Sequence, residues 1–245
     1  RPSCARLIRA RRCRRSSIAR RNGYVTADDL ASAFANLPAA WAEALPGWTA
    51  ERRSEVIANI RRASGDRAIA PDDPFRALRL CAPEAVKVVV FGQDPYPKPG
   101  QADGLAFSAG AGRPASLRRI FQVLAADRPG FAPPAVWKLD AWAQQGVLLL
   151  NPTLTIGVGR IGSHLDCGWQ ALTSQIVQVL CRFADPPVFL LWGEKSQRFF
   201  EQALRAGTAP QVLKTRHPSN DMQRRFMAAG SHFLRTSDLV DWWAI

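Results

Sequence analysis

Four short apolar runs, each followed by turn-forming polar residues, constrain the fold of this chain more than any other feature. Each run is mostly β-branched or aliphatic and is bounded by Gly or Pro, which is typical of buried strands. The runs are Val86–Phe91, Val147–Leu150, Val188–Trp192 and Gln211–Thr215. Helical patterns lie between them, at residues 116–126, 138–145, 169–183 and 195–206. Because strands alternate with helices, the sequence predicts an α/β fold: a single three-layer α/β/α domain with a central four-stranded parallel sheet.

Two more helices are expected ahead of the first strand. Thr26 has the side chain of an N-cap, and Leu30, Phe34 and Leu37 follow it at helical spacing. A second helical pattern covers residues 49–63.

The basic residues are unevenly distributed. The 245 residues include 33 Lys and Arg against 20 Asp and Glu, a net charge of +13, which favours nucleic acid or a membrane surface as partner. Nine Arg and no acidic residue fall within 1–23, so 24 basic residues remain in 24–245 and the net charge there is only +4. We expect a basic, flexible N-terminal extension over 1–23 and one domain over 24–245. The extension is interpreted as a solvated tail, with a DNA-contacting arm or a targeting segment as alternatives.

Cysteine and histidine usage argues against a metal site or a disulfide framework. The five Cys form no C-x-x-C pair, and only three His are present. No apolar run reaches the roughly 18 residues that a membrane-spanning helix needs. We therefore expect no zinc site, no disulfide framework and no membrane partner, and a reducing, cytoplasmic location inside the cell.

Polar and turn-forming residues come just after the predicted strands. Asp94, Asn151, Gly193 and His217 follow the first to the fourth strand. Since the carboxyl ends of parallel strands meet at one edge of a sheet, these residues should line one crevice, where α/β proteins bind ligands. Asp94 suits a general base or the stabilisation of a cation, Arg216 would keep His217 neutral, and Asn151 matches the edge of a nucleobase. Taken singly, Asp94, Asn151 and His217 each also have a structural interpretation.

Two positions outside the strand ends are also candidates. Phe107 either belongs to the core or stacks on a flat ligand. Ser116 is expected as the N-cap of a helix, where free N–H groups also suit a phosphate.

Longer motifs connect these positions. They are Gly92-Gln-Asp-Pro-Tyr-Pro97, Pro99-Gly-Gln-Ala-Asp-Gly-Leu-Ala-Phe-Ser108, Leu148-Leu-Leu-Asn-Pro-Thr-Leu-Thr155, Val188-Phe-Leu-Leu-Trp-Gly193 and His217-Pro-Ser219. In order and spacing they resemble the family 1 uracil-DNA glycosylases. The resemblance implies a DNA repair enzyme that flips deoxyuridine out of single- or double-stranded DNA and hydrolyses its N-glycosidic bond, leaving an abasic site. It also implies a monomer that needs no metal or cofactor and that a proteinaceous inhibitor binds.

The resemblance implies a role for each site residue. Asp94 positions the attacking water and stabilises the sugar cation, and His217 hydrogen-bonds the uracil oxygen that gains charge. Asn151 reads the edge of uracil, Phe107 stacks on the base, and Tyr96 excludes the methyl group of thymine.

Four more residues complete the set that the resemblance implies. Gln93 supports the uracil pocket. The phosphate backbone is contacted by small residues, namely Ser116, Gly193 and Ser219.

The last loop departs from the family pattern His-Pro-Ser-Pro-Leu-Ser. It reads His217-Pro-Ser-Asn-Asp-Met222, which aligns Asp221 with the Leu that fills the gap left by the flipped base. Because an acidic side chain is unfavourable in a base stack, we interpret Met222 as a shifted wedge. Arg224 and Arg225 would then offset the acid and hold phosphates. The loop predicts weaker extrusion from duplex DNA, and so a stronger preference for single strands.

Two smaller departures concern single residues. Pro97 stands where many members of the family have His, and it removes one backbone donor. Glu194 stands where a small residue is common, and we expect it to point away from phosphate as the first-turn acid of the next helix.

Two other functions fit the same fold. One is a catalytically weak or inactive relative that binds uracil or DNA, which loss of Asp94 or His217 would indicate; both residues are present. The other is a different α/β enzyme that binds a nucleotide, but the chain lacks the G-x-x-x-x-G-K-[ST] and G-x-G-x-x-G sequences that would support it.

Overall fold

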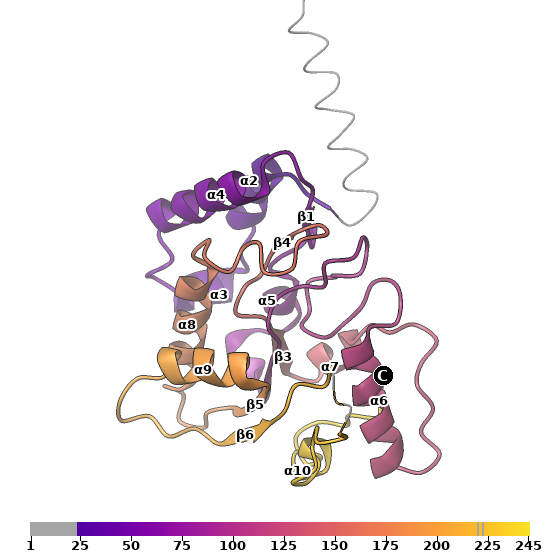
Figure 1. Cartoon of the computed structure of the whole chain (residues 1–245). Coiled ribbons are helices and arrows are strands. Elements are labelled where there is room, and N and C mark those ends of the chain that lie inside the picture. The colour runs from indigo at the N-terminus through magenta and orange to yellow at the C-terminus, as the bar shows by residue number, and fades with distance from the viewer. Residues whose placement is uncertain (1–23, 220, 222) are drawn as a thin grey trace, which may run out of the picture.

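A four-stranded parallel sheet forms the centre of the computed structural model, which describes residues 24–219, 221 and 223–245 (Figure 1). The strand order is β3–β2–β5–β6. The strands are β2 (Val88–Phe91), β3 (Val147–Leu150), β5 (Val188–Trp192) and β6 (Val212–Thr215). All four predicted strands are confirmed, although β2 begins two residues later and β6 one residue later than expected. Val88 pairs with both Val147 and Val188, so the carboxyl ends of the three strands lie level.

Side chains along β5 point alternately to the two faces of the sheet, and each face packs against a different layer of helices. The ring of Phe189 lies 4.7 Å from that of Phe200 on α9 (Glu194–Ala203), which packs beside α8 (Trp169–Leu180). Trp192 points to the other face, where its ring lies 5.8 Å from Phe233 on α10 (His232–Arg235). Figure 1 shows α8 and α9 together, well separated from α6 (Ala115–Asp127). The expected three-layer α/β/α arrangement is confirmed.

The remaining helices lie before and between the strands. They are α2 (Ala27–Ala35), α3 (Ala39–Ala44), α4 (Ala50–Ser64), α5 (Arg76–Leu80), the 3-10 helix η1 (Pro83–Ala85) and α7 (Asp140–Gln144). The expected N-cap at Thr26 is confirmed, because its hydroxyl accepts the N–H of Asp29. The expected N-cap at Ser116 is wrong: Pro114 holds that position of α6, and Ser116 lies in the first turn. Its side chain instead faces the cavity described below.

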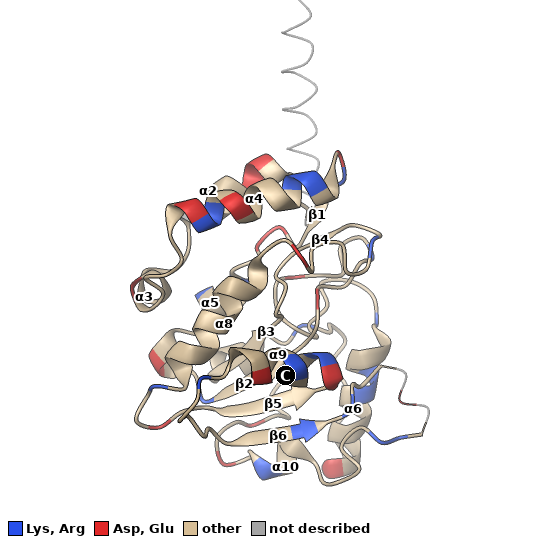
Figure 2. Ribbon diagram, turned by 60° about the vertical axis from the view of Figure 1, so that its left-hand side comes forward, with Lys and Arg blue, Asp and Glu red and all other residues tan. Residues whose placement is uncertain are grey.

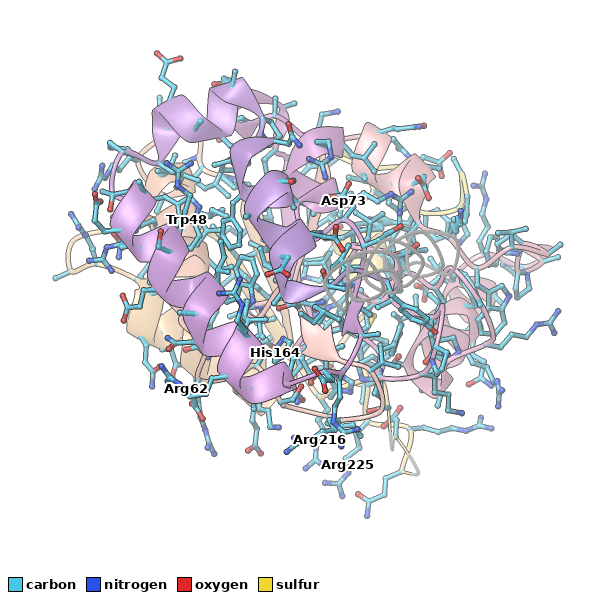
Figure 3. The ribbon with its side chains drawn as sticks, turned by 90° about the horizontal axis from the view of Figure 1, so that it is seen from above. Trp48, Arg62, Asp73, His164, Arg216 and Arg225 are labelled. Carbon is cyan, nitrogen blue, oxygen red and sulfur yellow. The ribbon has the colours of Figure 1, made fainter. Side chains whose placement is uncertain are left out.

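A small antiparallel sheet joins the N-terminal helices to the segment after β3. It pairs β1 (Ile69–Ala70) with β4 (Ile156–Gly157). The imidazole of His164 is buried behind it, with Nε2 2.8 Å from Ser64 Oγ and Nδ1 2.9 Å from Thr155 Oγ1. Figure 3 shows His164 beneath the end of α4. Within the residues that the structure describes, no helix is long and apolar enough to cross a membrane.

Candidate active site

The ends of β2, β3 and β6 open into a cavity of about 630 Å³. Eight of the residues singled out in the sequence line it: Gln93, Asp94, Tyr96, Phe107, Ser116, Asn151, His217 and Ser219. The parallel sheet brings the first, second and fourth strand ends together because their carboxyl ends share one edge. Residues separated by more than 120 positions in the chain thus face one space.

The Asp94 carboxylate is half-buried in the turn after β2. The backbone N–H of Gly162 donates to Oδ2 at 3.0 Å, which fixes the carboxylate against the wall of the cavity. Burial raises the pKa of Asp94 above its ordinary value, while the Gly162 N–H, the charge of Lys195 and the Gln93 side chain act in the opposite direction. The site therefore holds a partly desolvated carboxylate that a cation nearby helps to keep ionised.

The hydrogen bonds of His217 determine where its proton sits. The backbone N–H of Ser219 donates to Nδ1 at 3.1 Å, and the Ser219 hydroxyl lies 2.7 Å from the same nitrogen. Because a backbone N–H only donates, Nδ1 is an acceptor and the neutral ring carries its proton on Nε2. Burial lowers the pKa of His217, and the charge of Lys195 lowers it further. At neutral pH the ring is therefore an uncharged Nε2–H donor.

Tyr96 and Phe107 form a rigid apolar wall. The Phe107 ring is buried, 5.1 Å from Trp192 and 5.8 Å from the His217 ring. The backbone of Phe107 has a φ of +65°, which is strained for an aromatic residue. The Tyr96 hydroxyl donates to the Phe107 carbonyl at 3.1 Å and lies 2.7 Å from Ser116 Oγ, so it stabilises this conformation.

The carboxamide of Asn151 lies across the end of β2. A Cβ on Gly92 would be only 2.1 Å from Asn151 Oδ1, so the absence of a side chain at Gly92 makes room for the amide. Gln93, the next residue, lines the cavity as well. A side chain with a donor and an acceptor thus sits at the sheet edge and lines the same cavity as Tyr96 and Phe107.

A second, basic groove of about 1160 Å³ adjoins the cavity and shares His217 and Ser219 with it. Lys195, Arg216 and Arg225 line the groove. Figure 2 shows Lys and Arg in α9, at the end of β6 and in the loop beyond it, and Figure 3 shows Arg216 and Arg225 side by side and pointing outward. This groove has the charge that a phosphate backbone requires.

Gly193 lines the groove and lies against His217, which faces both spaces. Its φ is +110°, and a Cβ there would lie 2.9 Å from the Cβ of His217. Glu194, the residue after it, is exposed in the first turn of α9 and pairs with Arg198 at 3.3 Å. The expected position of Glu194 in the first turn is confirmed, but its side chain lines the basic groove, so its orientation away from phosphate stays a prediction.

The loop after β6 turns its acidic residue inward. The Asp221 side chain is only 4% exposed and forms an ion pair with Arg119 on α6 at 2.8 Å. Arg224 and Arg225, which follow it, are exposed. Met222 and the extension 1–23 lie outside the described residues.

Three groups that bear on the site were missed in the sequence. Lys195 changes the pKa of both Asp94 and His217, and its place just after β5 was the available signal. The Gly162 N–H and Arg119 reach their partners across 68 and 102 positions of the chain, and no local pattern marks such contacts.

Among the described residues, no group of three or more His, Cys, Asp or Glu side chains is arranged to hold a metal ion.

Known proteins are similar to this chain over most of its length. The sequence model of the uracil DNA glycosylase superfamily matches residues 78–240. The uracil-DNA glycosylase of Bordetella parapertussis is 42% identical over 217 residues, covering 85% of this chain and 84% of the relative. That of Albidiferax ferrireducens is 44% identical over 191 residues, covering 70% and 75%, respectively.

Solved structures share the fold. The mimivirus uracil-DNA glycosylase superposes with a TM-score of 0.63 at 21% identity, covering 74% of this chain and 68% of that one. A mimivirus UNG variant in complex with UGI gives a TM-score of 0.65 at 22% identity, covering 75% and 70%. The family match and the identities with curated relatives, together with a cavity built from the same motifs, show that this chain belongs to the uracil-DNA glycosylase family.

Proposed function

We propose that this chain releases uracil from DNA by hydrolysing the N-glycosidic bond of a flipped deoxyuridine, as the first step of base excision repair. The observation that carries the proposal is the meeting of Asp94, Asn151 and a neutral His217 in one cavity at the sheet edge. In this proposal residues 24–245 are the catalytic domain, acting as a monomer on intracellular, cytoplasmic DNA, and 1–23 are a basic extension. Neither metal nor cofactor takes part.

Bond cleavage follows from the charges of the two catalytic residues. As the C1′–N1 bond breaks, the electron pair goes to uracil and the sugar becomes cation-like. The ionised Asp94 stabilises that cation and positions the water whose oxygen bonds to C1′. The Nε2–H of His217 donates to the uracil oxygen on which negative charge develops. Water thus supplies a hydroxyl to the sugar and a proton to the departing base.

The remaining residues select and hold the substrate. Asn151 pairs with the edge of uracil, Phe107 stacks on the ring, and Tyr96 blocks the space that a thymine methyl would need. Gln93 supports the pocket from the turn after β2. Phosphates are held by Ser116, Gly193 and Ser219 around the cavity.

The enzyme is also proposed to prefer single-stranded substrate. Asp221 aligns with the intercalating Leu of the family, and an ion pair holds its side chain inside the protein. Without an apolar side chain at that position, the protein fills the gap that a flipped base leaves in a duplex less favourably. The test is the ratio of kcat/KM for one uracil-containing oligonucleotide as a single strand and as a duplex. Equal values for the two substrates would contradict the preference.

A proteinaceous inhibitor is proposed as a second partner, because a structurally similar UNG has been solved in complex with UGI. Loss of uracil release on addition of equimolar UGI would support this. Undiminished release at a large excess of UGI would exclude it.

The activity itself has a simple test. An oligonucleotide with one uracil, incubated with the protein and heated in alkali, should break at that position. Oligonucleotides with cytosine or thymine there should stay intact. A protein that binds the uracil strand but leaves it whole would favour the inactive relative instead.

A further inference from the structure

Both carboxylate oxygens of Asp221 accept hydrogen bonds, and the side chain is largely buried. Its Oδ2 accepts from Arg119 Nε at 2.8 Å, and its Oδ1 accepts the N–H groups of Arg225 at 2.6 Å and Phe226 at 3.0 Å. Burial alone would raise the pKa of Asp221, but these hydrogen bonds together hold it below its ordinary value. The side chain is therefore charged at neutral pH and held by three hydrogen bonds.

The same residue closes a tight turn. The Asp221 carbonyl accepts the N–H of Arg224 at 3.0 Å, and Arg224 adopts a φ of +50°, which non-glycine residues rarely adopt. The far end of the turn is anchored by Phe226, which is 2% exposed, and by the Met227 N–H, which donates to Thr215 Oγ1 at 2.8 Å. The exposed arginines thus project from a loop that is tied down at both ends.

The ion pair also ties this loop to α6, whose first turn lines the cavity. Arg119 lies one turn beyond Ser116 on α6, and Ser116 contacts the Tyr96 hydroxyl at 2.7 Å. The loop begins at His217, whose ring faces the same cavity. The Asp221–Arg119 pair therefore connects the helix that supports Tyr96 with the loop that starts at His217.

The pair also reduces a charge conflict. Asp221 lines the groove together with Arg216 and Arg225, and a free carboxylate there would repel phosphates. Pairing with Arg119 offsets the charge of that carboxylate, while Arg216 and Arg225 point outward (Figure 3).

We propose that the Asp221–Arg119 pair positions the loop after β6 so that Arg224 and Arg225 face the phosphates flanking the flipped nucleotide. Asp221 and Arg119 are then positioning residues: they act on DNA affinity and leave the bond-breaking step alone. The proposal rests on the glycosylase function described above.

The Asp221→Ala variant tests the proposal because a pure charge effect and a positioning effect of Asp221 predict opposite changes in DNA affinity. If Asp221 acted only through its charge, its removal would strengthen DNA binding. If it positions the loop, removal should raise KM for a uracil oligonucleotide about tenfold, the value expected for a charge-assisted hydrogen bond, with kcat changed less than about threefold. Arg119→Ala should have a similar effect, and the double variant should be no worse than either single one. The isosteric Asp221→Asn keeps the Oδ1 acceptor and should lose less affinity than Asp221→Ala.

Controls match the charge changes on exposed sites. Asp238→Ala removes an exposed acid, and Arg128→Ala removes an exposed arginine at the end of α6; both should leave KM unchanged. Circular dichroism and thermal unfolding establish that every variant is folded. A KM of Asp221→Ala equal to or below that of the wild type would overturn the proposal, as would a double variant whose loss is the product of the two single losses.

The Kd for a uracil oligonucleotide, measured by anisotropy in an Asp94→Asn background, separates the two claims. It reports the role of the pair even if the wild-type protein releases no uracil, an outcome that would count against the glycosylase function alone.

Discussion

The charge of Lys195 acts on both catalytic candidates. It lowers the pKa of Asp94, which burial raises, and it adds to the burial that lowers the pKa of His217. The proposed mechanism requires an ionised Asp94 and a neutral His217. By lowering both pKa values, Lys195 therefore extends the pH range of that form on the acid side.

The Lys195→Met variant should therefore lose activity at a higher pH than the wild type. Without the cation, the pKa values of Asp94 and His217 both rise, so the acid limb of kcat/KM moves upward by about half a pH unit. The matched control is Lys214→Met, which removes a different ammonium group, one that pairs with Glu201 at 2.7 Å. The pH profile of uracil release from a single-stranded oligonucleotide checks this. An acid limb that stays in place, or that shifts equally in the control, would contradict the role of Lys195.

At the scale of elements, the junction between β5 and α9 sets the position of His217. Gly193 lies there with a φ of +110°, and the space where its Cβ would lie is filled by His217. The end of β5, the start of α9 and the side chain of His217 are therefore packed closely together at Gly193.

Gly193→Ala should displace the His217 ring and lower the rate. The positive φ alone costs about 1–3 kcal/mol, and a ring displaced by about 1 Å reduces kcat on the order of 100-fold. Gly230→Ala is a matched control, because Gly230 has a φ of +119° and nothing within 4 Å of its Cβ. The control should lose similar stability in urea unfolding but keep its kcat. Equal kcat values for the two variants would show that contact with His217 does not matter.

Across the whole molecule, two buried histidines make stability depend on pH. Burial lowers the pKa of His164 to about 4, and it lowers the pKa of His232 to about 4 as well. The unfolded chain takes up these protons near pH 6.5, whereas the folded protein resists them. Stability should therefore fall as the pH drops from 6.5 toward 4, by about 3 kcal/mol for each residue.

Urea unfolding of the wild type and His164→Gln at pH 7.5 and 4.5 isolates the contribution of His164. The difference in unfolding free energy between the two pH values should be smaller in the variant, because it lacks the group that gains the proton. Carboxylates that titrate in the same range affect both proteins equally and cancel in the comparison. An equal difference in both proteins would mean that His164 binds its proton as readily in the folded protein as in the unfolded chain, and would contradict a lowered pKa.

The fold was largely predictable from the sequence because its strands are short apolar runs ended by Gly, Pro or polar residues. The convergence of Asp94, Asn151 and His217 followed from the rule that parallel strands end at one edge. Ser116 shows where local patterns fail: Pro114 holds the N-cap position of α6, and the Ser116 hydroxyl contacts the hydroxyl of Tyr96, a residue 20 positions away. The inward turn of Asp221 depends on Arg119 in a distant helix, and no pattern within the loop contains that information.

The central claim is that Asp94 carries the hydrolysis of the glycosidic bond. Its most direct test is the single-turnover rate of uracil release from an oligonucleotide by the wild type and by Asp94→Asn, which keeps the shape of the side chain and removes its charge. The account predicts release by the wild type and a rate about 10²- to 10⁴-fold lower in the variant, with an unchanged Kd for the DNA. An Asp94→Asn protein that releases uracil at the wild-type rate would contradict it.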